Sequence, residues 1–284
     1  MPVLSIDGLR LHYQAVGDGP GVLLIHGWAS SWRMWARSMI RLAQAGYRAW
    51  AVDLIGFGAS DKPGNDWYSL ERFTRTLTDF SDRVGLDRPA LVGHSMGGTI
   101  ALDMATRRET RSLIAVSPIV NGELGLPLRR LWTSPLLRRL FETVRRRAIF
   151  SAAGNMRLVA LPWLPRDFAR KRMLQDLRTT TVNAAVGSLR AVVASNLQHR
   201  LPMIHAPTLV LAGGRDTTVP PTQARLAARS IPGARLVIWP AAGHQLVDER
   251  GDDFDALLID HLDRACGRRA GRSVGAEHPV QSEA

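Results

Sequence analysis

Residues 90–100 read Ala-Leu-Val-Gly-His-Ser-Met-Gly-Gly-Thr-Ile, and this stretch decides the fold. The apolar run at its start predicts a buried strand, and the residues after Ser95 predict the start of a helix. A serine on so sharp a turn needs neighbours without a Cβ two positions before and after it, where this chain has Gly93 and Gly97. The pattern Gly-x-Ser-x-Gly in this setting predicts a nucleophilic serine at the turn.

The composition is that of an ordinary globular protein. The chain has 284 residues, of which 45% are hydrophobic and 22% are charged, which suits one large α/β domain with an insertion. We expect a soluble, cytoplasmic protein, because no basic segment leads into an apolar one at the N-terminus and no apolar run approaches the ~18 residues of a spanning helix. The single cysteine, Cys266, excludes an internal disulfide and fits a reducing compartment.

The rest of the chain alternates between strand and helix patterns. Residues 3–6 and 9–16 predict a half-buried hairpin around Asp7-Gly8. Short, nearly continuous apolar runs then predict strands buried on both faces, at 22–25, 49–52, 90–92, 113–116, 209–211 and 236–238. Helical patterns separate most of them, at 32–45, 69–84, 96–107, 221–230 and 252–265. The alternation predicts an α/β fold with a mainly parallel sheet flanked by helices.

One long interval interrupts this rhythm. It is helical in pattern, rich in arginine, and punctuated by the prolines at 127, 135, 162 and 165. We interpret it as a helical cap inserted into the sheet domain. The predicted parts of the chain are an α/β core at 1–118 and 207–266, the helical cap at 119–206 and a disordered tail at 267–284.

Two further residues complete a catalytic set with Ser95. A serine hydroxyl is a weak nucleophile at neutral pH, so it needs a histidine base and a carboxylate that orients the histidine. Asp216 and His244 each follow a predicted strand, and such groups collect beyond the carboxyl ends of strands in open α/β sheets. We therefore predict that His244 is the base and Asp216 the orienting acid. Glu123, which follows another predicted strand, remains an alternative acid.

An acyl-transfer enzyme also needs hydrogen-bond donors for the developing oxyanion. The motif His26-Gly27-Trp28 directly follows the first buried strand, and we predict that the backbone N–H groups of Trp28 and Met96 are these donors. The loop from Asp53 to Ser60 borders the same edge and is interpreted as structural. His94, beside the nucleophile, is also interpreted as structural, packing beneath the turn.

Together these motifs resemble the α/β-hydrolase superfamily over about residues 3–265. The resemblance rests on His26-Gly27-Trp28, Asp53 to Ser60, Gly93 to Gly98, Gly213-Gly214-Arg215-Asp216 and Gly243-His244, in the family's order and spacing. It implies the α/β-hydrolase fold and leaves the substrate open. Members that hydrolyse haloalkanes or epoxides carry aspartate at the turn, so Ser95 disfavours both activities. The first motif and the basic cap are also similar to bacterial carboxylesterases that cleave pimeloyl esters from acyl carrier protein.

These residues predict a serine hydrolase that cleaves carboxylic esters or thioesters through an acyl-enzyme intermediate. The apolar cap residues predicted to line its acyl pocket are Trp132, Met156 and Trp163, with Leu124 and Leu126. Carbon–carbon bond hydrolysis and cofactor-free perhydrolysis on the same triad remain alternatives. A low-turnover receptor for a small ligand is the alternative from another class of function.

No cofactor and no metal are expected. Histidine and cysteine do not recur at metal-ligand spacing, and the glycines at 56–58 are not followed by a helix that would hold a phosphate.

Positive charge is concentrated in 121–200, which holds 15 Arg or Lys and 4 Asp or Glu. This segment includes a predicted basic amphipathic helix at 134–148. We interpret it either as a solvated outer face or as a dock for an anionic membrane surface or an acidic carrier protein. Without a recognised binding module, nucleic acid is not an expected partner.

Overall fold

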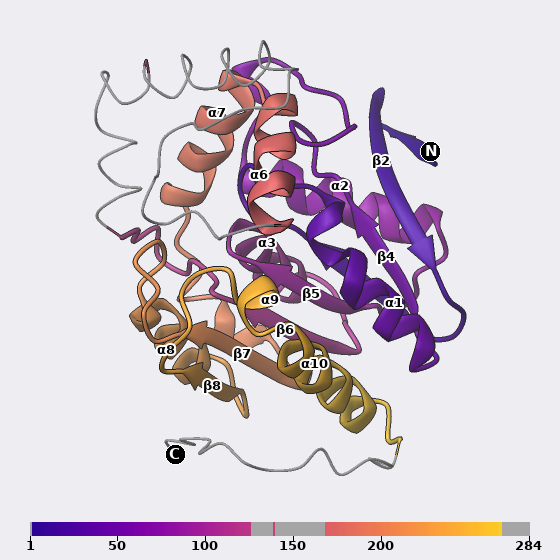
Figure 1. The fold of residues 1–284 in the computed structure, drawn as a ribbon, viewed down its shortest axis with the longest axis vertical. Coiled ribbons are helices and arrows are strands. Elements are labelled where there is room, and N and C mark those ends of the chain that lie inside the picture. Colours follow the sequence, from indigo (N-terminus) through magenta and orange to yellow (C-terminus); the bar gives the residue numbers. More distant parts are fainter. Residues whose placement is uncertain (1, 126–138, 140–167, 269–284) are drawn as a thin grey trace.

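The computed structural model describes residues 2–125, 139 and 168–268. Within these residues, a sheet of eight strands lies between helices (Figure 1). The strands have the order β1-β2-β4-β3-β5-β6-β7-β8. The pairs β1–β2 and β2–β4 are antiparallel, and the pairs from β4 through β8 are parallel. The carboxyl ends of β3 to β8 therefore lie at one edge of the sheet.

The strands are β1 (Val3–Ile6), β2 (Leu9–Val16), β3 (Gly21–Ile25), β4 (Arg48–Val52), β5 (Ala90–His94), β6 (Ser112–Val116), β7 (Thr208–Gly213) and β8 (Arg235–Trp239). The helices are α1 (Ala36–Gln44), α2 (Leu70–Arg83), α3 (Met96–Ala105), α6 (Phe168–Thr179), α7 (Val182–Val193), α8 (Pro221–Ser230), α9 (Leu246–Glu249) and α10 (Gly251–Ala265). Single 3-10 turns are η1 (Trp32–Trp35), η2 (Asn65–Trp67) and η3 (Leu201–Met203). The strands and core helices predicted from the sequence are all present, with ends within two residues of those predicted, except that the helix expected at 32–45 begins as the 3-10 turn η1 and becomes α-helical only at Ala36.

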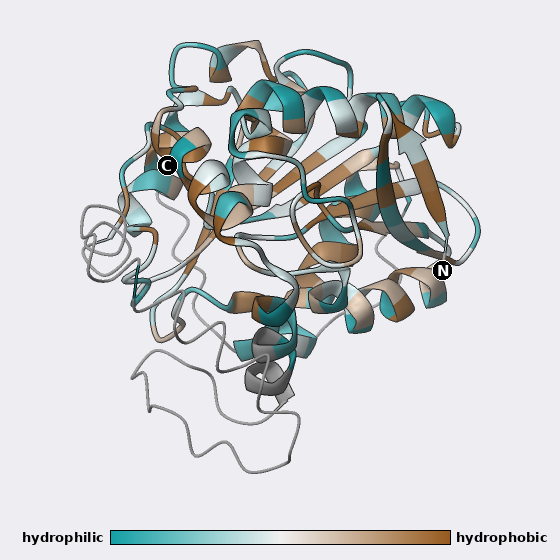
Figure 2. Ribbon diagram, turned by 90° about the horizontal axis from the view of Figure 1, so that it is seen from above, coloured by the Kyte–Doolittle hydropathy of each residue, from teal (hydrophilic) through white to brown (hydrophobic). Residues whose placement is uncertain are grey.

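The parallel strands separate two hydrophobic cores, one on each face of the sheet. In β3, Leu23 and Ile25 belong to the core that contains residues of α2 and α3, whereas Val22 and Leu24 belong to the core that contains residues of α1 and α10. Figure 2 accordingly shows mostly brown strands in the interior and helices in which teal and brown segments alternate. Because both faces are covered, successive residues of each strand are apolar, which accounts for the continuous apolar runs in the sequence.

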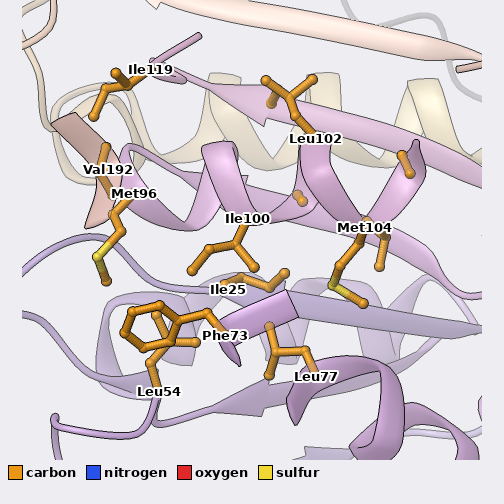
Figure 3. Close-up of a cluster of buried hydrophobic side chains, with 14 of the residues drawn as sticks. Ile25, Leu54, Phe73, Leu77, Met96, Ile100, Leu102, Met104, Ile119 and Val192 are labelled. Carbon is orange, nitrogen blue, oxygen red and sulfur yellow. The ribbon is translucent and has the colours of Figure 1, made fainter. Parts of the chain in front are cut away.

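Helix α3 is buried along its whole length, from Met96 to Ala105. Figure 3 shows Met96, Ile100 and Met104 of this helix among Phe73 and Leu77 of α2. Most of its residues are apolar, as expected of a helix that lies inside the protein. The turn that carries Ser95 is therefore built between a central strand and a firmly packed helix.

The chain between β6 and β7 includes α6 and α7, which lie together at one end of the molecule (Figure 1). Their helical structure agrees with the helical pattern predicted from the sequence for this interval. The division of the chain into core and cap remains a prediction. Trp132, Met156, Trp163 and the tail from 269 lie outside the described residues, as does the basic segment 134–148 except for Arg139. In the described part of the chain, no helix is long and apolar enough to cross a membrane.

Candidate active site

Ser95 lies between β5 and α3 in a backbone conformation that few residues adopt. Its φ of 55° and ψ of −118° are outside the usual regions for an L-residue, at a cost of roughly 1–3 kcal/mol. Two backbone bonds hold it there: its N–H donates to the Val116 carbonyl at 2.8 Å, and its carbonyl accepts from the Thr99 N–H at 3.0 Å. Surrounding structure thus imposes the sharp turn that the motif predicts.

The glycines around Ser95 are required by close backbone packing. A Cβ on Gly93 would collide with the carbonyl of Gly97, and a Cβ on Gly97 would collide with the carbonyl of Ile25 at the end of β3. A Cβ on Gly27 would lie 3.3 Å from the Cβ of Ser95. The prediction that the flanking positions exclude a side chain is confirmed, and the loop after β3 packs directly against the Ser95 turn.

His244 and Asp216 meet beyond the ends of β8 and β7. The distance from His244 Nδ1 to Asp216 Oδ2 is 2.7 Å, and Asp216 Oδ1 accepts from the N–H groups of Thr218 and Val219 at 2.8 and 2.9 Å. Burial acts to raise the pKa of Asp216, but the hydrogen bond and charge interaction with His244 and the two backbone donors lower it overall. Asp216 is therefore ionised at neutral pH and accepts the Nδ1 proton of His244, which makes Nε2 the acceptor of the neutral ring.

Glu123 is bonded elsewhere. Its Oε2 accepts from Gln223 Nε2 at 3.1 Å, and the Gln223 carbonyl oxygen Oε1 in turn accepts from the Val120 N–H at 2.9 Å. The structure thus brings Asp216, and not Glu123, to His244. The alternative acid left open by the sequence does not have the geometry for that role.

His94 connects the Ser95 turn to the loop that carries His244. Its Nε2 donates to the carbonyl of His244 at 2.8 Å, and the two ring centroids are 4.8 Å apart. Burial, followed by repulsion from His244, lowers the pKa of His94 to about 3. The ring is therefore neutral at physiological pH and its one proton is on Nε2, which agrees with the structural interpretation of this residue.

The two predicted oxyanion donors belong to the residue after Ser95 and to the loop that packs against the Ser95 turn. Met96 is the first residue of α3, and the first N–H groups of an α-helix have no acceptor within the helix. Trp28 lies in the loop after β3, and its indole Nε1 donates to the carbonyl of Ala185 in α7 at 2.8 Å. This bond ties the loop of one predicted donor to the inserted helices.

The side chain of His26 fixes the loop after β3 that carries Trp28. Its Nε2 accepts from the Leu54 N–H at 2.9 Å, so the ring proton is on Nδ1, which donates to the carbonyl of Gly27 at 2.7 Å. Burial lowers the pKa of His26, an effect that the nearby Asp53 charge only partly opposes. The neutral ring therefore holds the backbone next to Trp28 in one shape.

Comparison with known proteins identifies the family. A family model described as the alpha/beta hydrolase family matches residues 22–257. The chain belongs to the alpha/beta hydrolase family. The predicted α/β-hydrolase fold is thereby confirmed.

Three similar proteins illustrate the range of this family. A 2-hydroxy-6-oxo-6-phenylhexa-2,4-dienoate hydrolase from Comamonas testosteroni is 29% identical over 276 residues, covering 91% of this chain and 93% of that protein. The structure of a hydrolase from Pseudomonas aeruginosa PA01 is 25% identical, with a TM-score of 0.74, and covers 92% of this chain and 97% of its own. The enol-lactonase from Burkholderia xenovorans LB400 is 24% identical, with a TM-score of 0.75 over 92% of this chain and 99% of its own, and shares the fold.

The Asp53 loop of this hydrolase is structural, as interpreted. Asp53 Oδ2 accepts from His12 Nδ1 and from the Ala59 N–H, both at 2.8 Å, while Oδ1 accepts from the Trp32 N–H at 2.8 Å. Despite burial, which acts to raise it, the hydrogen bond from His12, the neighbouring His26 ring and the two backbone donors lower the pKa of Asp53 overall. The carboxylate ties β2, η1 and its own loop together beneath the site. The pairing of Asp53 with His12, which lies 41 residues away, has no local signal in the sequence.

Helix α6 carries two buried ionisable side chains that were not among the residues predicted from the sequence. Arg172 donates to both carboxylate oxygens of Asp248 in α9, at 2.8 and 2.6 Å. One turn later, Asp176 Oδ1 accepts from Ser31 Oγ at 2.6 Å, and Asp176 Oδ2 is buried with no hydrogen-bond partner among the described residues. Among the described residues, no group of three or more His, Cys, Asp or Glu is arranged to hold a metal ion.

Asp176→Asn is expected to stabilise the hydrolase in a pH-dependent way. Burial raises the pKa of Asp176 to about 6 from its ordinary 3.8, so the folded state binds this proton more tightly than the unfolded state. The free energy of unfolding then falls as pH rises through this interval. Because Asn keeps an acceptor for Ser31, we expect it to add up to about 3 kcal/mol at pH 8 and almost nothing at pH 4.

Urea unfolding of both proteins at the two pH values measures this difference. Asp66→Asn is the matched control, because Asp66 is exposed on η2, and it should change stability little at either pH. Equal stability of wild type and Asp176→Asn at pH 8 would contradict the assigned burial of this carboxyl group.

Proposed function

We propose that this protein is a serine hydrolase that cleaves carboxylic esters or thioesters through an acyl-enzyme. The observation that carries the proposal is the 2.7 Å bond between His244 Nδ1 and Asp216 Oδ2, at the sheet edge where Ser95 occupies its strained turn. A histidine oriented by an ionised carboxylate is what a serine hydroxyl needs to become a nucleophile at neutral pH. His94, which precedes Ser95 and bonds the carbonyl of His244, links the two halves of the site.

In the proposed reaction, Ser95 Oγ attacks the acyl carbonyl carbon while His244 Nε2 accepts the hydroxyl proton. The N–H groups of Trp28 and Met96 stabilise the oxyanion, each contributing about 3 kcal/mol. The imidazolium then gives its proton to the leaving alcohol or thiol, which departs as the acyl-enzyme forms. Water, deprotonated by His244, attacks this ester in turn; the acid leaves and Ser95 regains its proton.

The proposed substrate pocket lies beside the proposed oxyanion site. Trp28 is bonded to α7, so the inserted helices border the proposed oxyanion site. We place the acyl group between this edge and the inserted segment, with Trp132, Met156 and Trp163 as the proposed lining. Docking of the basic segment to an anionic membrane or an acidic carrier protein, and a cytoplasmic location, likewise stand as proposals.

Carbon–carbon bond hydrolysis is the second candidate. It is favoured by the Comamonas testosteroni hydrolase, whose likeness covers 91% of this chain and 93% of that protein. The name of that relative describes a 2-hydroxy-6-oxo-dienoate substrate, whose cleavage breaks a carbon–carbon bond. The same serine, histidine and aspartate would serve this reaction, so the substrate assay decides between the two.

Pre-steady-state hydrolysis of p-nitrophenyl butyrate tests the proposal. We expect steady turnover above the buffer rate, and a butyryl group on Ser95 in protein quenched with acid and mapped by mass spectrometry. A burst of p-nitrophenolate should appear wherever deacylation is the slower step. Cleavage of a 2-hydroxy-6-oxo-dienoate without ester hydrolysis would favour the second candidate, and tight binding without turnover of either would favour a receptor.

A further inference from the structure

One carboxylate holds the loop of His244 on both sides. The N–H of Gly243 donates to Glu249 Oε2 at 2.6 Å, and the N–H of Gln245 donates to Glu249 Oε1 at 3.1 Å. The two oxygens of Glu249 therefore bracket the residue that we propose as the base. A Cβ on Gly243 would lie 3.0 Å from Glu249 Oε1, tighter than most contacts of a real Cβ.

The helix that ends at Glu249 is itself fixed in place. Its neighbour Asp248 forms the two-bond ion pair with Arg172 of α6, and both side chains are largely buried. The same turn buries Leu246 and Val247 in the core that faces α1 and α10. Glu249 thus reaches the His244 loop from a rigid support.

The remaining contacts of His244 are made by its carbonyl and its ring. The carbonyl accepts from His94 Nε2 at 2.8 Å, and Nδ1 donates to Asp216 at 2.7 Å. The backbone on either side of His244 is held by Glu249. Without that carboxylate, the peptide groups at 243 and 245 lose the acceptor that fixes their orientation.

We propose that Glu249 is a positioning residue that sets the orientation of the His244 imidazole for proton transfer with Ser95. This inference rests on the proposed function. Proton transfer and attack require the reacting groups to be placed within fractions of an ångström, and a misplacement of about 1 Å costs on the order of 10²-fold in rate. Glu249 acts through the backbone and does not touch the substrate.

A purely structural role makes a different prediction. An acidic residue in the first turn of a helix that accepts from the N-cap N–H, here that of Gln245, is a common capping arrangement whose loss lowers stability. The bond to Gly243 lies outside that arrangement, because Gly243 precedes the N-cap residue by two positions. If Glu249 positions His244, its replacement lowers kcat. If Glu249 only caps the helix, its replacement lowers the stability of the protein and leaves kcat unchanged.

The test compares Glu249→Ala and Glu249→Gln with wild type. We expect Glu249→Ala to lower kcat for p-nitrophenyl butyrate by roughly 10- to 100-fold with KM changed less than about twofold, because substrate contacts are intact. The Gln variant keeps one acceptor oxygen and should recover part of kcat. Glu109→Ala is the matched control, because Glu109 is 81% exposed and pairs only with Arg88 among the described residues; it should behave as wild type.

Proton NMR supplies a second readout that does not depend on turnover. The His244 Nδ1 proton shared with Asp216 should give a downfield resonance that broadens in Glu249→Ala and not in Glu109→Ala. A Glu249→Ala protein that is less stable but has wild-type kcat and an unchanged resonance would be merely uncapped and would overturn the proposal. If Ser95→Ala remained active, the proposed function would fail; if Ser95→Ala were inactive and Glu249→Ala fully active, only the positioning role would fail.

Discussion

Ser95→Ala is expected to fold like wild type and to lose ester turnover by roughly 10⁴- to 10⁶-fold, the scale seen when the nucleophile of a triad is removed. Alanine keeps the Cβ that already fits the turn, and the bonds that hold φ at 55° are backbone bonds to Val116 and Thr99. The substitution therefore removes the attacking oxygen alone. Steady-state hydrolysis of p-nitrophenyl butyrate measures the loss, and circular dichroism with thermal unfolding verifies the fold.

Ser117→Ala provides a matched control for this prediction. Ser117 follows the adjacent strand β6, is buried with a positive φ of 45°, and has an Oγ without a hydrogen-bond partner among the described residues. Its replacement removes the same atom from a similar backbone at the same edge of the sheet. We expect activity within about twofold of wild type, typical of a change that removes no transition-state contact. Equal losses in the two variants would point to structural damage in place of a lost nucleophile.

Asp216→Asn should lower turnover by about 10⁴-fold while leaving a folded protein. The reason follows from its backbone contacts. Oδ1 of residue 216 accepts from the N–H groups of Thr218 and Val219, so the asparagine oxygen is held at that position and its NH₂ group faces His244. Nδ1 must then accept, the ring proton moves to Nε2, and the base can no longer take the proton of Ser95.

Glu123→Gln tests the alternative acid under the same assay. Glu123 is bonded to Gln223 and does not contact His244 in the structure, so we expect its amide variant to retain nearly full activity. Full activity in Asp216→Asn together with a large loss in Glu123→Gln would assign the orienting acid to Glu123.

Much of the core could be predicted from the sequence because its signals are local. Burial on both faces makes strands such as 22–25 and 209–211 continuously apolar, and the Ser95 turn needs glycines at fixed distances. Asp216 and His244 could be singled out because each follows such a strand. The chemistry of a serine nucleophile then limited which of the charged residues to consider.

The contacts that support these residues could not be predicted in the same way. Glu249, Asp176 and Arg172 are three among 25 acidic and 37 basic residues, and only their three-dimensional placement separates them from side chains on the surface. Arg172 meets Asp248 across 76 residues and Asp176 meets Ser31 across 145. The net charge of the arginine-rich interval was the basis for its interpretation. A net charge does not distinguish Arg172, which is paired with Asp248, or the buried Asp176 from exposed charged residues.

Reaction with a fluorophosphonate, followed by peptide mapping, tests the central claim most directly. Such a reagent phosphonylates a serine that a neighbouring base has activated, and leaves ordinary serines unmodified. We expect one label per chain, on Ser95, with no label on Ser95→Ala and slower labelling of Asp216→Asn, while Glu123→Gln and Ser117→Ala react like wild type. Ester hydrolysis by wild-type protein that carries no label, or a label on any other residue with Ser95 unmodified, would contradict the assignment of Ser95 as the nucleophile.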